Sequence, residues 1–319
     1  MRKLLLILSV VCFVAVACTD KDYDLSNIED NFAIGDSESE FLAPLATLTF
    51  HAKSFSHHNS NNNKESVIDV YKEADIWLPT TLPGGVDYVE VQRLMSDMAY
   101  LDTIVEALIT EMENSPAKAN SVYNLIAVNH KAEYLAYVKT HAPAEIYAAL
   151  ESASTEQTVS LISQLFEADH GWAVEAIESI CAERLNDLTF DNVVYDLPAL
   201  DLSEDIKDMI VGNIGNKGEA NENKLYIAGH VDSGFPFDIN VSPRIENTSV
   251  EFKNIHLYFN EEVDIPQQQV YKSDVEKLFG GAKIVIEFAI ERYYPGKVDI
   301  AKQEAHIELH LRKTGCLTL

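Results

Sequence analysis

The sequence predicts an α+β protein, an antiparallel β-sandwich with an inserted all-helical bundle. Three observations predict this class. Apolar residues alternate with period 2 near the start, follow a 3.6-residue period through residues 88–187, and alternate again through residues 188–319. Strands on both sides of the helical block favour an insertion, with residues 41–87 and 188–319 forming one β-sandwich domain. Two consecutive domains with a small independent N-terminal piece are the alternative.

The first element is an export signal. Arg2 and Lys3 precede an apolar run over residues 4–17 that only Ser9 interrupts. A run of this length matches the apolar region of a signal peptide and is too short to cross a bilayer. Residues 1–17 are therefore expected to be removed.

The end of this run resembles the lipobox of bacterial lipoproteins, because the small residue Ala17 stands directly before Cys18. In that class the cysteine thiol is diacylated and becomes the first residue of the mature protein. The resemblance implies lipidation at Cys18 and attachment to a membrane through the acyl chains. The alternative is an ordinary secretory signal that is cleaved after Ala17.

An acidic tether follows over residues 18–40, and its start, CTDKDYDLSNI, adds a second resemblance. It is similar to the start of uncharacterised Bacteroidetes outer-membrane lipoproteins of the CxDKDYDLS type. LYIAGHVDSGFPFDINVSP at residues 225–243 and HLRKTG at residues 310–315 also resemble that group. The resemblance implies an outer-membrane location, with the cell surface favoured over the periplasmic face. It does not extend to the helical block.

The N-terminal β segments come next. Residues 41–52 suit a strand, and residues 54–66 suit a loop because they are rich in Asn and Ser. From Ile68 to Leu78 the apolar residues partly alternate with acidic ones, which predicts another strand ending at Pro79.

The helical block contains about five expected helices. Apolar residues at helical spacing predict a long helix over residues 91–112. Pro116, Pro143 and Gly171 mark later helix boundaries, and Ser154 with Gln157 has the form of a capping box.

The C-terminal third returns to strands. Alternating runs predict strands over 225–232, 235–241, 255–259, 284–290 and 305–311. Expected turns lie at residues 233–234, 280–281 and 295–296, and a short helix is expected to begin after Ser203.

Composition excludes several functions. The chain has 24 Lys and Arg against 51 Asp and Glu, a formal net charge of −27, which would repel nucleic-acid phosphates.

Among the four cysteines, Cys181 and Cys316 remain after export, and Cys181 is expected to be a small buried residue. Nothing in the sequence pairs the two.

No catalytic or cofactor motif occurs, so no cofactor or metal is expected. His306 and His310 share one face of a strand but stand about 13 Å apart at about 3.3 Å per residue, too far for one metal. His57 and His58, with His51 nearby, are expected to be loop residues rather than a metal site.

These observations predict a non-catalytic binding or structural module of the cell envelope, whose partner is an envelope protein or a glycan. A carbohydrate-active enzyme or a glycan-binding surface protein is the alternative. The candidate ligand-binding residues are Trp77, Tyr293 and Tyr294, because aromatic rings at strand ends and loop tips can stack against sugars.

Overall fold

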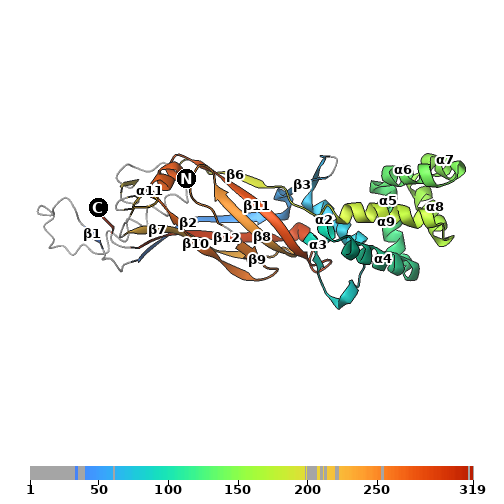
Figure 1. The fold of residues 1–319 in the computed structure, drawn as a ribbon, viewed down its shortest axis with the longest axis horizontal. Coiled ribbons are helices and arrows are strands. Elements are labelled where there is room, and N and C mark those ends of the chain that lie inside the picture. Colours follow the sequence, from blue (N-terminus) through green and yellow to red (C-terminus); the bar gives the residue numbers. More distant parts are fainter. Residues whose placement is uncertain are drawn as a thin grey trace, which may run out of the picture.

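The computed structural model describes residues 33–34, 40–59, 62–197, 199, 207–208, 211, 214–219, 223–252, 255–314 and 317–318. The molecule is elongated, with strands in one half and helices at the other end (Figure 1). The short strands β1 (Ala33–Ile34) and β13 (Leu317–Thr318) pair with each other at the end that faces away from the helices. None of the helices in the described ranges is long and apolar enough to cross a membrane.

Two antiparallel sheets form the β part. The first has the strand order β10, β7, β12, β2, and the second has the order β5, β11, β8, β9, with β6 also paired to β11. The bounds are β2 Glu40–His51, β5 Val89–Glu90, β6 Val193–Leu197, β7 Lys224–Ser233, β8 Phe237–Ile245, β9 Ile255–Leu257, β10 Glu262–Val270, β11 Ala282–Tyr293 and β12 Glu304–Thr314.

The inner faces of the two sheets share one core, which confirms the expected sandwich. Ile227 on β7 and Ile239 on β8 are buried in the same apolar cluster. Phe55 links the sheets, since its ring lies 6.2 Å from that of Phe50 on β2 and 5.4 Å from that of Phe288 on β11. Side chains from both inner faces meet in this way in a sandwich core.

The C-terminal strands lie where the sequence predicts them, with two differences. The turn after Ser233 carries the chain from one sheet to the other, so β7 and β8 are not paired with each other. Strands β6 and β10 and helix α11 (Lys272–Phe279) were not expected; β10 escaped notice because residues 262–270 hold few apolar side chains. The helix expected after Ser203 falls largely outside the described residues.

The helical unit runs from α2 to α9. The bounds are α2 Val67–Trp77, α3 Val91–Ser96, α4 Met98–Asn114, α5 Pro116–Asn129, α6 Lys131–His141, α7 Ala144–Ser152, α8 Thr155–Glu167 and α9 Gly171–Leu185. The capping box at Ser154 is present, since its side chain and that of Gln157 each bond the other's backbone N–H. The long helix expected over 91–112 is broken at Asp97, which caps α4 by accepting a bond from the Tyr100 amide.

Helix α2 corrects the strand predicted for residues 68–78. Its buried positions are Val67, Val70, Tyr71, Glu73, Ala74 and Trp77. The spacing of three and four residues is that of a helix, and burial of the polar Glu73 concealed it from a count of apolar residues. Helical structure therefore begins at Val67, before the expected boundary at residue 88. That residues 88–187 can be separated from the sandwich is still a prediction.

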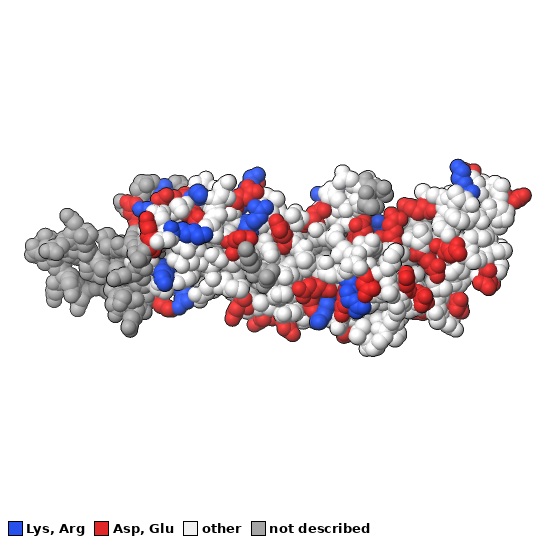
Figure 2. All heavy atoms as spheres, in the orientation of Figure 1, with Lys and Arg blue, Asp and Glu red and all other residues white. Residues whose placement is uncertain are grey.

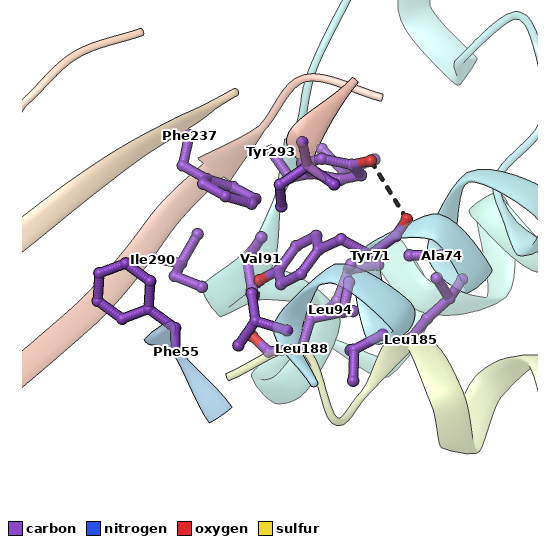
Figure 3. Packing of buried hydrophobic residues seen from close by; sticks show 14 of the residues in the cluster. Phe55, Tyr71, Ala74, Val91, Leu94, Leu185, Leu188, Phe237, Ile290 and Tyr293 are labelled. Carbon is purple, nitrogen blue, oxygen red and sulfur yellow. Dashed lines mark hydrogen bonds between the residues drawn. The ribbon is translucent and has the colours of Figure 1, made fainter. Parts of the chain in front are cut away.

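The helical unit and the sandwich meet in an aromatic core around Tyr71 (Figure 3). Its ring centroid lies 4.5 Å from that of Phe237 and 4.8 Å from that of Tyr293. The Tyr293 hydroxyl oxygen lies 3.4 Å from the backbone oxygen of Tyr71, the contact drawn in Figure 3. This contact continues the core of the sheets into the helices.

Candidate functional site

A polar cleft lies at the junction of the sandwich and the helical unit, and we call it the junction cleft. It is formed by the hairpin of β3 (Ser56–His58) and β4 (Lys64–Ser66), by α2, by the turn between α5 and α6, and by α9. Its volume is about 520 Å³, within the range of small-ligand sites. The described residues that line it are Asn59, Asn63, Lys64, Glu65, Ser66, Asp69, Glu73, Asn129, His130, Glu133, Ile180, Glu183 and Arg184.

The Glu73 carboxylate is the most buried acid of the cleft, with 10% of its side chain exposed. Its Oε1 accepts hydrogen bonds from Trp77 Nε1 at 3.0 Å and from Arg184 Nε at 2.9 Å. His130 Nε2 lies 2.7 Å from the same oxygen. Glu73 and Trp77 stand four residues apart on α2, so the helix itself brings the carboxylate and the indole together.

These partners keep Glu73 ionised. Burial raises the pKa of its carboxyl, but the hydrogen bond and charge of His130, the Trp77 bond and the charge of Arg184 outweigh burial and lower the pKa to about 2. A carboxyl with this pKa holds no proton near neutral pH and cannot act as a general acid.

Arg184 extends the network to the hairpin. Its Nη2 lies 2.8 Å from Glu65 Oε2, and Asn59 Nδ2 donates to the other oxygen of Glu65 at 2.5 Å. Burial raises the pKa of Glu65, whereas the hydrogen bonds and charge of Arg184 lower it further than burial raises it. One guanidinium on α9 therefore ties the β3–β4 hairpin to α2.

A second set of polar contacts fixes β3 to the segment after α9. His57 is buried, and its Nε2 lies 3.0 Å from Asp187. His58 Nδ1 lies 2.9 Å from Asp191, which also accepts a hydrogen bond from Ser56. The two histidines belong to a strand rather than to the expected loop, and they approach different carboxylates. Within the described ranges no group of three or more His, Cys, Asp or Glu residues is placed to hold a metal ion.

Trp77 is not the exposed ring that its predicted strand position required. Its side chain is fully buried and its indole nitrogen bonds Glu73. The error follows from the strand assignment: on a helix, Trp77 falls on the same face as Val70 and Ala74, and this face is packed. It therefore cannot stack against a sugar.

Tyr293 and Tyr294 have different surroundings. Tyr293 is buried with only 3% exposed and donates its hydroxyl to Asp75, so it is not available to a ligand either. Tyr294 is half-buried and packs 5.8 Å from the ring of Tyr88, while its hydroxyl donates to Asp238 at 3.0 Å. Of the three aromatic candidates only Tyr294 reaches the surface.

Several predicted features lie outside the described residues: the signal peptide, Cys18, most of the tether and Cys316. Cys181 is free and buried, as expected, and burial raises the pKa of its thiol. His306 and His310 lie along β12, where His306 bonds Glu304 and both side chains keep contact with solvent.

The sequence did not single out Glu73, His130 or Arg184. They are separated by 57 and 54 residues along the chain, and no local pattern relates them. The sequence does place Glu73 and Trp77 four residues apart, but this spacing indicates contact between their side chains only if residues 67–77 form a helix.

Comparison with known proteins adds little to this site. No protein-family model matches the chain, and no curated protein matches it significantly. Among solved structures, one similar chain comes from Parabacteroides distasonis ATCC 8503 and is described as a "putative secreted protein". The TM-score is 0.29 at 20% sequence identity, and the match covers 40% of this chain and 39% of that one. The similarity thus spans well under half of that protein and supports no conclusion about function.

Proposed function

We propose that this chain is a lipid-anchored, non-catalytic binding or structural module of the bacterial outer membrane that displays its helical unit away from the membrane, on the cell surface. The support for anchoring is the sequence of residues 1–18, with its positive start, short apolar run and cysteine after a small residue.

The arrangement of the two ends carries the proposal. Strand β1, which begins 15 residues after Cys18, lies at the end of the sandwich that faces away from the helices (Figure 1). An extended segment of this length reaches at most about 50 Å. An anchor at Cys18 would therefore hold the sandwich near the membrane and direct the helical unit outward.

The charge of the helical unit is consistent with this orientation. Residues 88–187, which hold α3 to α9 of this unit, contain 16 Asp and Glu against 5 Lys and Arg. Figure 2 shows many acidic side chains spread over the helical end. An anionic lipid surface would repel such a unit, which favours its distal position.

The junction cleft supports binding rather than catalysis. Glu65 and Glu73 are both bonded to Arg184, and the pKa of Glu73 is lowered to about 2. A glycosidase instead needs one carboxyl with a raised pKa opposite a second carboxylate. Apart from the imidazole of His130, no aromatic ring is among the described residues that line the cleft, so it also lacks a stacking surface for sugars.

Glycan binding remains the second candidate function, and Tyr294 supports it. Its half-buried ring lies beside Tyr88 and Phe259, and the Arg292 guanidinium lies 4.5 Å over the Tyr88 ring. Aromatic rings with adjacent charged groups are suited to sugars. Loss of glycan binding on Tyr294→Ala, without loss of folding, would favour this candidate.

Cys18→Ser tests the anchor. The change should abolish incorporation of radiolabelled palmitate and release the protein from membranes. Cys12→Ser is the matched control, because Cys12 lies in the segment expected to be removed, and labelling should persist. Continued labelling of the Cys18→Ser chain would refute lipidation at this residue. Protease treatment of intact cells then tests surface exposure, and pull-down from solubilised membranes tests for a stoichiometric protein partner.

A further inference from the structure

The Glu73 carboxylate has one oxygen that the protein does not use. All three of its contacts, with Trp77, His130 and Arg184, are made by Oε1. Oε2 has no hydrogen-bond donor among the described residues, although nine-tenths of the side chain is buried and Glu73 lines the junction cleft. Because Oε2 is not enclosed by the protein, water or a ligand in the cleft can donate a hydrogen bond to it.

The cleft is acidic both at its buried base, which we call the floor and where Glu73 lies, and at its exposed edge, which we call the rim. Five acidic side chains line the cleft against Lys64, Arg184 and the imidazole of His130, and both Arg184 and His130 are already engaged with Glu73. Asp69 on α2 and Glu133 on α6 are exposed at the rim. Among the described residues, the basic group that Glu133 approaches is His130 Nδ1, at 4.0 Å. The cleft therefore carries excess negative charge, which favours a cation.

We propose that the junction cleft binds a primary ammonium group, which donates to Glu73 Oε2 at the floor and is attracted by Asp69 and Glu133 at the rim. The inference rests on the proposed function only in assigning the cleft to binding rather than to catalysis. It holds whether or not Cys18 carries lipid.

The free oxygen selects ammonium over guanidinium. A guanidinium binds a carboxylate best through two parallel N–H groups, one to each oxygen. Oε1 of Glu73 already accepts from Trp77 and Arg184 and contacts His130, so only one oxygen is open. A compact ammonium with three donors can bond that oxygen and turn its other donors to the rim or to water.

The ammonium could belong to a free small amine or to the lysine side chain of a peptide. Ligand-observed saturation-transfer NMR on the full chain carrying Cys18→Ser distinguishes them. The probes are n-butylammonium, 1-butanol as its neutral match, acetyl-lysine amide and acetyl-arginine amide. We expect n-butylammonium to bind with a Kd of about 1 mM, and 1-butanol and acetyl-arginine amide to bind at least about fivefold more weakly. Tighter binding of acetyl-lysine amide would assign the site to a peptide side chain, and equal binding to a free amine.

Substitutions at the rim test the binding without disturbing the buried contacts of Glu73, on which the stability of the protein depends. Asp69→Asn combined with Glu133→Gln should weaken n-butylammonium binding about fivefold or more, while Lys64→Gln should strengthen it about twofold by removing a like charge. Glu145→Gln combined with Glu156→Gln, two exposed acids on α7 and α8, is the control and should change binding less than about 1.5-fold. Glu73→Gln should abolish binding if circular dichroism shows that the variant folds.

Three results would overturn the proposal: equal binding of n-butylammonium and 1-butanol, no binding of n-butylammonium at tens of millimolar, or equal losses in the rim and control variants. Displacement by potassium at constant ionic strength, as effective as n-butylammonium itself, would show a site for any small cation and would also overturn it. None of these results bears on palmitate labelling at Cys18, so the two proposals fail separately.

Discussion

Glu73→Gln is the most informative perturbation of the junction between the sandwich and the helices. The substitution keeps the shape of the side chain but removes the charge that Arg184 and His130 face. Both partners are largely buried, with 17% and 8% of their side chains exposed. Since the guanidinium of Arg184 would lose one of the two carboxylates that balance its charge, the variant should be markedly less stable.

The magnitude follows from the pKa of Glu73. Folding lowers it from 4.5 to about 2, a difference that corresponds to about 3 kcal/mol of stabilisation at neutral pH. Because the pKa is lower in the folded state, this stabilisation is complete above about pH 4.5 and is lost as the pH falls from there towards 2. Wild type and variant should therefore differ by about 3 kcal/mol at pH 7 and converge at about pH 2 and below.

Urea denaturation at several pH values, followed by near-ultraviolet circular dichroism and tryptophan fluorescence, measures this difference. Glu178→Gln is the matched control. Burial and then the nearby charges of Glu175, Glu106 and Asp102 raise the pKa of Glu178, so loss of its charge should leave stability unchanged or raise it by up to about 0.5 kcal/mol. A loss below about 1 kcal/mol for Glu73→Gln at pH 7, or a difference independent of pH, would refute the reasoning.

Three further outcomes are expected. Gly229→Ala should lower the free energy of unfolding by more than about 2 kcal/mol, because a Cβ there would overlap the Glu308 carbonyl oxygen on β12. Gly171→Ala is the control and should change this free energy little, because the space around Gly171 is open. Equal urea midpoints for the two variants would contradict the prediction. Replacement of residues 88–187 by a short Gly/Ser linker should leave a folded but less stable sheet protein by circular dichroism, and a chain unfolded under all conditions would contradict the insertion model. The Cys181 thiol should resist alkylation in the native protein and react only after unfolding, because it is buried with a raised pKa; rapid native labelling, read by mass spectrometry, would show an opening of the helical unit.

Local sequence determined the starts of α5, α7, α8 and α9 and most C-terminal strands, but not the breaks at Asp97 and His130. The capping box at Ser154, the Ser115 cap before Pro116 and the start of α9 at Gly171 all depend on residues a few positions apart. Such signals act through the backbone of one turn, so they remain valid whatever the element packs against. The alternation over 305–311 likewise predicted β12, since one face of that strand keeps contact with solvent.

Tertiary structure decided α2, the separation of β7 and β8 into different sheets, and the junction cleft. Residues 68–78 alternate in part, but burial of Tyr71, Glu73 and Trp77 on one helical face came from partners more than 50 residues away. A buried carboxylate is stable only with its counter-charges in place, and His130 and Arg184 reach Glu73 through the packing of α5, α6 and α9. Pairing over such separations depends on how whole elements pack, and no residue spacing in the sequence records it.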